Sequence, residues 1–204
     1  MELVWFKTPT DGDEGTLNLA YNAVDVRVIR GGAADPAVSG ETSLDFAGLL
    51  EQSGALAGAM RGLGVEPGQH VGVLLADPLR ELLVLLASAR LGATCVVLDD
   101  GRVDEFAPHL VVTDTALHPG EHAPAAAILS GIEPADETRE VAWDIAVKAG
   151  RTDPAGCEPV APSSIAFVLD EPVPIASALT DPSRFGTALA ALVSGRPVSL
   201  GAAS

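Results

Sequence analysis

Lysine is nearly absent from this chain of 204 residues, which contains only Lys7 and Lys148. Almost all of its 12 basic side chains are therefore arginines. An arginine stays protonated in proteins, whereas a buried lysine can change its pKa and so act in acid–base or covalent chemistry. Chemistry that needs a tunable ammonium group thus has two candidates, and neither lies in a recognisable motif.

Cysteine and long apolar runs are also scarce. Cys95 and Cys157 lie far apart, and Cys95 falls inside a predicted buried strand, so no disulfide framework is expected. The N-terminal residues have no basic segment followed by an apolar stretch. No run approaches the roughly 18 apolar residues of a membrane-spanning helix. These absences predict an intracellular, cytoplasmic protein.

Aromatic residues make up 4% of the chain although 48% of it is hydrophobic, so the core must consist mainly of Ala, Val and Leu. Such a core suits an α/β protein with a mostly parallel sheet and helices on both faces. The net charge is −16, with 14 acidic and 7 basic side chains in residues 1–102 and 14 and 5 in residues 103–204. This charge excludes nucleic acids and anionic membranes as expected partners. The alanine-rich, lysine-poor usage is typical of a GC-rich bacterial source.

Hydrophobic periodicity and cap residues predict the order of the elements. An arm over residues 1–35, with a helix near 19–29, precedes a single α/β domain over 36–204. This domain is divided into a core at 36–115, a looser part at 116–162 and a closing βαβ unit at 163–204. The predicted helices are 43–64 with Ser43 as N-cap, 77–92 with Asp77 as cap and Pro78 first, 103–106, 141–148, and 181–193 with Asp181 as cap. A hairpin is expected at 36–42, and strands at 70–75, 93–98, 110–113, 127–129, 165–169 and 197–200.

Two stretches, taken together, resemble a known family. The run Leu-Asn-x-x-Tyr-Asn-x-x-Asp at residues 17–25 resembles the N-terminal part of acetyl- and propionyl-CoA synthetases. Residues 43–99 are similar to the early core of the wider adenylate-forming superfamily, in which a helix, a Gly-Val turn and strand, and an Ala-x-x-Arg-x-Gly-Ala helix end follow in this order. The similarity extends over about residues 15–115 and more loosely over 116–170.

The resemblance implies an enzyme that activates a carboxylate with ATP and transfers the acyl group to coenzyme A. Family members hold the triphosphate in a Ser/Thr/Gly-rich loop that ends in lysine, whose amides, hydroxyls and ammonium group bind phosphate. Here the strand at 165–169 is followed by Asp-Glu-Pro-Val-Pro. Two carboxylates repel phosphate, and each proline removes an amide donor. The phosphate loop is therefore expected to be lost.

A second departure concerns coenzyme A. In acetyl-CoA synthetases, two arginines after the strand matching residues 110–113 bind its phosphate, and a loose alignment places His118 and Glu121 there. Only about thirty residues follow the altered loop, so the ribose-binding aspartate and the lysine of the C-terminal lobe are also expected to be missing. We therefore predict a truncated relative with no catalytic residues and no cofactor.

Two groups of side chains remain as candidate sites. Asp99 and Asp100 follow one strand and Asp170 and Glu171 another, so they are the candidate ligand-binding residues of an acidic crevice that could take a divalent cation or an amine; the alternative is that they cap helices or face water. His118, Glu121 and His122 could be imagined as metal ligands, but a Pro-Gly turn lacks helical spacing and a solvated loop is the preferred interpretation, with no metal.

Two functions are therefore in competition. The first is a catalytically inactive acyl-CoA synthetase-like protein that serves as a binding, regulatory or assembly subunit, with a protein partner such as an acyl-CoA enzyme or a second copy of the chain. The alternative is a small-molecule-binding protein or enzyme that uses adenylate, an acyl group or coenzyme A on the same scaffold. The first is favoured because strand patterning and helix caps are kept while the phosphate loop is not.

Overall fold

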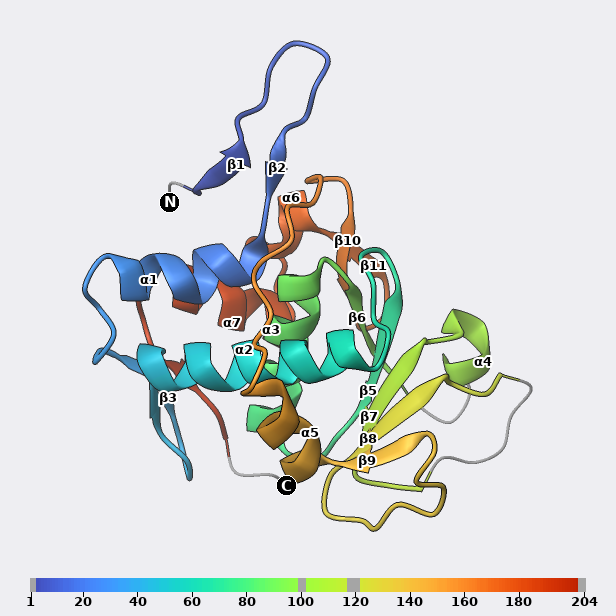
Figure 1. Ribbon diagram of the computed structural model, residues 1–204. Helices are drawn as coiled ribbons and strands as arrows, with labels where there is room; N and C mark the ends of the chain where they lie inside the picture. Colours follow the sequence, from blue (N-terminus) through green and yellow to red (C-terminus); the bar gives the residue numbers. More distant parts are fainter. Residues whose placement is uncertain (1–2, 99–101, 117–121, 202–204) are drawn as a thin grey trace.

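The centre of the molecule is a seven-stranded sheet with the order β11-β10-β6-β5-β7-β8-β9 (Figure 1). The computed structural model describes residues 3–98, 102–116 and 122–201. All neighbouring strands are parallel except β10 and β11, which form an antiparallel pair. The strands are β5 (His70–Leu74), β6 (Thr94–Val97), β7 (Leu110–Thr113), β8 (Ala126–Leu129), β9 (Glu140–Ala142), β10 (Ile165–Val168) and β11 (Pro172–Pro174). The predicted α/β class with a mostly parallel sheet is confirmed.

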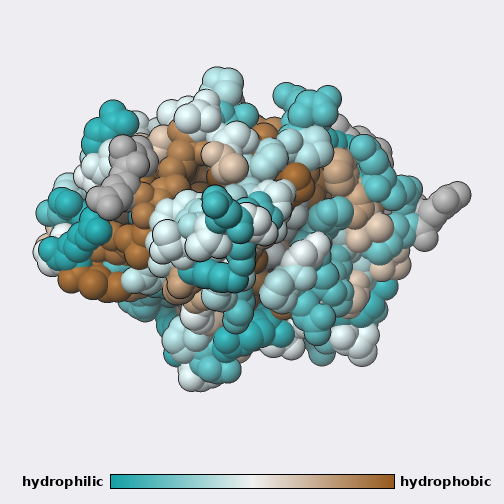
Figure 2. Space-filling view, turned by 90° about the horizontal axis from the view of Figure 1, so that it is seen from above, coloured by the Kyte–Doolittle hydropathy of each residue, from teal (hydrophilic) through white to brown (hydrophobic). Residues whose placement is uncertain are grey.

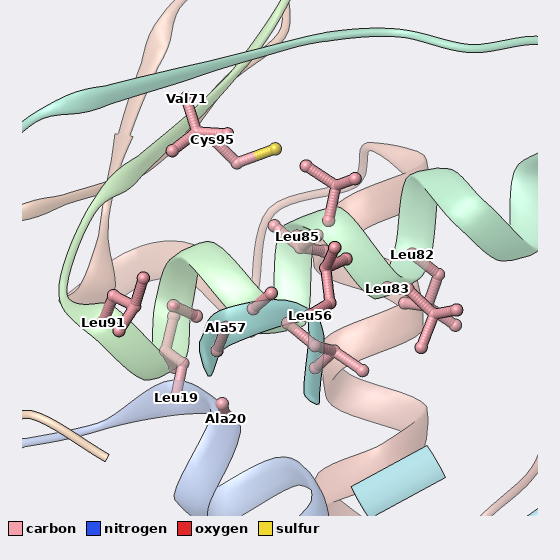
Figure 3. Packing of buried hydrophobic residues seen from close by; sticks show 14 of the residues in the cluster. Leu19, Ala20, Leu56, Ala57, Val71, Leu82, Leu83, Leu85, Leu91 and Cys95 are labelled. Atoms are coloured by element: carbon pink, nitrogen blue, oxygen red, sulfur yellow. The ribbon is translucent and has the colours of Figure 1, made fainter. Parts of the chain in front are cut away.

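The central strands are apolar on both faces, because successive side chains point to opposite sides of a sheet. Val71 and Cys95 face the main core, where they meet helices α2 (Phe46–Gly62) and α3 (Pro78–Leu91) (Figure 3). Val96 and Val111 face the other side, where Val103 and Phe106 of the short helix α4 (Arg102–Phe106) pack against them. Helices therefore cover both faces, but α4 is short and most of the helical mass lies on one side.

Local sequence signals account for the β5–α3–β6 unit. The Asp77 carboxylate accepts hydrogen bonds from the amides of Leu79 and Arg80, and Pro78 occupies the first helical turn, where its missing N–H costs nothing. The helix ends at Gly92, whose φ of 70° lies in the left-handed region that glycine adopts without strain. The predicted caps at both ends are confirmed.

The remaining elements surround this core. β12 (Val198–Ser199), β3 (Pro36–Ser39) and β4 (Leu44–Asp45) form a three-stranded sheet, and the arm begins with β1 (Trp5–Lys7) and β2 (Thr16–Leu17), a two-stranded hairpin that projects from the body in Figure 1. A π-helical segment η1 (Tyr21–Asp25) continues into α1 (Val26–Ile29). The predicted helix near 19–29 is thus confirmed. α5 (Trp143–Gly150), α6 (Ile175–Ala178) and α7 (Arg184–Val193) complete the fold.

A buried polar network fastens the arm to the core. Asn18 is fully buried, and its side-chain amide donates to the carbonyls of Ala89 at 2.7 Å and Glu158 at 2.8 Å. The guanidinium of Arg90 donates to both carboxylate oxygens of Asp25, each at 2.7 Å. Burial raises the pKa of the Asp25 carboxyl, and the positive charge of Arg90 opposes that shift. Three segments far apart in the sequence are therefore joined by the neutral hydrogen bonds of Asn18 and the charge-assisted pair of Arg90 and Asp25.

Helices α2 and α5 approach each other closely. A Cβ built on Gly150 would overlap the backbone carbonyl oxygen of Ala55, and one on Gly58 would overlap that of Asp153. Glycine at these two positions therefore permits the contact that brings α5 against the core.

Among the described residues, no helix has the length and apolar character to cross a membrane.

Several local predictions were wrong. Asp45, not Ser43, caps α2 by accepting from the amide of Gly48, and Ser183, not Asp181, caps α7. In both cases a second capping residue two positions away gave the better geometry. Residues 163–204 do not form a βαβ unit, because β10 lies in the large sheet and β12 in the small one. Val141 belongs to β9 rather than to the helix that follows.

Replacing Arg90 with Met tests the buried network. The change leaves the Asp25 carboxylate, whose side chain is 18% exposed, without its countercharge. We expect the free energy of unfolding, measured in urea, to fall by about 3–5 kcal/mol. The control is Arg151→Met, which removes an ion pair to Glu51 whose side chains are 53% and 62% exposed, and should change stability by about 0.5 kcal/mol or less. Equal losses in the two variants would contradict the assignment.

Candidate functional site

The predicted acidic crevice belongs at the carboxyl ends of β6 and β10. These strands are parallel neighbours, with Phe167 opposite Cys95 and Val168 opposite Val96, so the residues that follow them emerge at one edge of the sheet. Asp170 and Glu171 lie there and are both exposed. Asp99 and Asp100 fall outside the described residues. Whether the four carboxylates converge therefore stays a prediction.

The connection after β10 is a tight turn. The strand turns back at once into β11, and Val168 pairs with Pro172 across a turn of three residues. Pro172 and Pro174 form part of the edge strand itself. Neither has an amide hydrogen, so they cannot donate to an anion at this edge. The turn that ends β10 thus offers exposed carboxylates and few backbone donors.

Arg102 lies at the end of the same two strands and was missed by the sequence analysis. Its guanidinium donates to the carbonyl of Val97 at 3.0 Å, to that of Leu169, and more weakly to that of Asp170 at 3.5 Å. Its guanidinium carbon lies 5.0 Å from the centre of the Phe106 ring, within the range of a cation–π contact. Backbone carbonyls, not amides, therefore point at this position, which is the reverse of what phosphate needs. The sequence signal was a basic residue directly after Asp99, Asp100 and Gly101.

A separate hollow opens at the carboxyl ends of β5, β7 and β8. It has a volume of about 420 Å³. Polar residues on its wall include Asp77 and Arg80 at the start of α3, Asp114 after β7, and Ser130 after β8. We call this hollow the switch-point crevice, because β5 lies between β6 and β7 and the chain changes direction across the sheet there. The sequence analysis did not single out Arg80, Asp114 or Ser130. Asp114 and Ser130 directly follow two predicted parallel strands, and this position could have indicated them.

The suggested metal ligands receive no support from the described part of the chain. His118 and Glu121 lie outside it. The ring Nε2 of His122 lies 2.9 Å from the carbonyl oxygen of Pro108 and must carry a proton to donate to it, and its backbone amide donates to Asp104. Among the described residues, no group of three or more His, Cys, Asp and Glu side chains is placed to hold a metal ion.

Both cysteines are poor nucleophiles. Cys95 is completely buried in β6, and burial raises the pKa of its thiol. Burial likewise raises the pKa of Cys157 to about 12, although the neighbouring Arg90 charge opposes the shift. The reactive species is the thiolate, so neither residue is suited to covalent catalysis near neutral pH.

Comparison with known proteins assigns the chain to a family. Residues 26–164 match the family described as AMP-binding enzyme. The mitochondrial acyl-CoA synthetase short-chain family member 3 of Rattus norvegicus is 31% identical over 124 residues, which cover 52% of this chain and 18% of that protein. An acetyl-coenzyme A synthetase of Streptomyces coelicolor is 34% identical over 103 residues, covering 48% and 15%. The matched stretches, about half of this chain, therefore cover less than a fifth of the length of these relatives.

A solved structure shows the same fold. The crystal structure of an acyl-CoA synthetase from Brucella canis superposes with a TM-score of 0.73 over 93% of this chain and 44% of that one, at 19% sequence identity. The predicted resemblance to the N-terminal part of acyl-CoA synthetases is thus confirmed for the fold and for the family.

Replacing Arg102 with Met tests its role at the strand ends. The carbonyls of Val97 and Leu169 would lose a charged donor, and we expect the free energy of unfolding to fall by about 1–3 kcal/mol. Arg196→Met is the control, because Arg196 is exposed and its side chain has no hydrogen bond or ion pair within the described residues. A loss no larger than that of the control would show that Arg102 does not hold the turn.

Thiol reactivity tests the cysteine assignments. At pH 8, native protein should react with a disulfide reagent much more slowly than a free cysteine, because the pKa of Cys157, about 12, leaves little thiolate. Raising the pH toward 12 should accelerate the reaction of Cys157 for as long as the fold persists. Unfolding in urea should expose both thiols to rapid reaction. One rapidly reacting thiol in the native protein at pH 8 would be inconsistent with this account.

Proposed function

We propose that this chain, which belongs to the AMP-binding enzyme family, is a catalytically inactive member that acts as a binding, regulatory or assembly subunit of a larger complex. The observation that carries the proposal is the turn after β10, where the family resemblance implies a phosphate loop. Three features of that turn argue against nucleotide activation: the direction of its backbone groups, its charge and its prolines.

The direction of the backbone groups is the strongest of these arguments. A triphosphate is held by amide and hydroxyl donors, and each hydrogen bond to such a charged group contributes about 1.5–3 kcal/mol. At the end of β10 the carbonyl of Leu169 accepts from Arg102 instead. Nη1 of Arg102 thus donates to the carbonyl of Val97 in β6 and to that of Leu169 just after β10, which directs the guanidinium toward the protein backbone.

Charge acts in the same direction but with a smaller effect. Asp170 and Glu171 are both exposed, so each would repel a phosphate charge at 4 Å by only about 1 kcal/mol in water-like surroundings. The repulsion grows to about 4 kcal/mol per pair where the effective dielectric constant is near 20. The carboxylates therefore weaken nucleotide binding, and the small number of backbone donors removes most of the favourable contacts.

The well-formed scaffold supports a retained binding role. The caps of α3 and the Asn18 and Arg90 networks hold the elements of the core together. Apolar side chains also remain on the surface: Phe6 is 46% exposed on the arm and Ile29 is 69% exposed at the end of α1. Figure 2 looks down on the face that carries the arm, where apolar surface lies between polar patches. These exposed side chains are available for contact with a protein partner, either an acyl-CoA enzyme or a second copy of the chain.

An activity assay tests the loss of chemistry. With ATP, Mg²⁺, acetate and coenzyme A, we expect no release of pyrophosphate, and calorimetry with ATP, AMP or coenzyme A at millimolar concentration should show no heat of binding. A full-length acetyl-CoA synthetase under the same conditions is the positive control. Turnover would refute inactivity, and heat with any one of the three ligands would favour a binder of that ligand on this scaffold.

The subunit role has its own test. The chain isolated from its native source under mild conditions should elute in a complex of larger mass, measured by size-exclusion chromatography with light scattering and native mass spectrometry. A lone monomer free of partners at physiological concentration would count against the proposal.

A further inference from the structure

We propose that the switch-point crevice binds a small zwitterion that carries one carboxylate and one ammonium group, as a free amino acid does. The crevice lies between α3 and the ends of β5, β7 and β8, away from the altered turn after β10. The inference goes beyond the proposed subunit role and rests on different residues. Open α/β sheets bind ligands at this point because the two loops that leave in opposite directions create a gap.

Arg80 supplies the positive end of the crevice, and its guanidinium is held in place before any ligand arrives. Its Nη1 donates to the hydroxyl of Ser130, which is only 5% exposed, and its Nε lies 3.5 Å from the Asp77 carboxylate. The guanidinium carbon lies 5.2 Å from the centre of the Trp143 ring. Within the described residues its Nη2 has no hydrogen-bond partner, so it can donate to a ligand carboxylate with little loss of side-chain entropy.

Asp114 supplies the negative end. One of its carboxylate oxygens, Oδ2, accepts from the amide of Ala76 at 2.7 Å, which fixes the side chain at the crevice wall. No ion pair of Asp114 is formed among the described residues, so its other oxygen can accept from an ammonium group. Glu41 lines the same crevice and adds a second acceptor. Asp77 is less available, because it caps α3 through the amides of Leu79 and Arg80.

The charges of the wall select the class of ligand. One guanidinium and the three carboxylates of Glu41, Asp77 and Asp114 line the crevice, which disfavours phosphates and nucleotides. A simple carboxylate would gain Arg80 but leave Asp114 and Glu41 opposed to it, and a simple amine would leave Arg80 unused. A zwitterion satisfies both ends. The volume of about 420 Å³ suits a ligand of this size, and Pro78, Leu79 and Leu200 offer apolar contact to its side chain.

Saturation-transfer NMR with matched ligands tests the proposal. L-leucine is compared with isocaproate, which lacks the amine, and with isoamylamine, which lacks the carboxylate; the other proteinogenic amino acids follow in turn. We expect binding of at least one amino acid at millimolar concentration and at least tenfold weaker binding of its two analogues. Absence of saturation transfer to every amino acid would overturn the proposal, as would an analogue that binds as tightly as its parent.

Variants locate the site. Arg80→Gln and Asp114→Asn should each weaken amino-acid binding about tenfold, or about 1.4 kcal/mol. The control is Arg196→Gln, which changes an exposed arginine that does not line the crevice and should leave the affinity unchanged. Circular dichroism is used to check that each variant is folded. If Arg80→Gln does not fold, the binding measured for Asp114→Asn decides the test, because asparagine can still accept from the amide of Ala76. Unchanged binding in a folded Asp114→Asn protein would place the ligand elsewhere. Because these ligands carry no nucleotide, failure here leaves the proposed loss of ATP chemistry untouched.

Discussion

The ion pair between Arg90 and Asp25 is the constraint on which the rest of the molecule depends. The Arg90 side chain is 5% exposed, and besides both oxygens of Asp25 it donates to the carbonyl of Ala155 at 3.1 Å. It therefore joins the arm, the end of α3 and the segment that leads to β10. Asn18 connects the same three segments through the carbonyls of Ala89 and Glu158. The residues that carry the family resemblance, Asn18, Asp25 and Arg90, thus act here as a structural fastening rather than as a catalytic set.

The residues that hold the scaffold together are different from the residues that line the edge of the sheet. The contacts of Arg90 and Asn18 orient α3 and the strands that follow it. They therefore fix the positions of the carboxyl ends of the strands. What that edge does depends on the short connections after each strand. After β10 the connection is closed by Arg102, whereas after β5, β7 and β8 the connections leave an open crevice with Arg80 at its wall. The same sheet edge therefore carries a closed turn at one place and an open crevice at another.

Local signals predicted much of the fold, and contacts between distant residues account for what was missed. Asp77, Pro78 and Gly92 act within a single helix, so their roles could be inferred from the sequence. Two capping residues close together, such as Ser43 and Asp45, cannot be ranked without the backbone. The pairing of β12 with β3 and the reach of Arg102 to Leu169 depend on how separate segments meet. Of the predicted acidic site, Asp170 and Glu171 lie at the expected edge, while Asp99 and Asp100 lie outside the described residues.

The close contact between α2 and α5 also affects Arg80, which lies in the switch-point crevice. Trp143, whose ring backs the guanidinium of Arg80, is the first residue of α5, and Gly150 is the last. Any side chain at Gly150 would collide with the backbone of α2 and push α5 away from it. Trp143 would move with it, and Arg80 would lose its aromatic support. The position of the Arg80 guanidinium in the switch-point crevice therefore depends on the spacing of α2 and α5, so a substitution far from the crevice can alter it while every lining residue is kept.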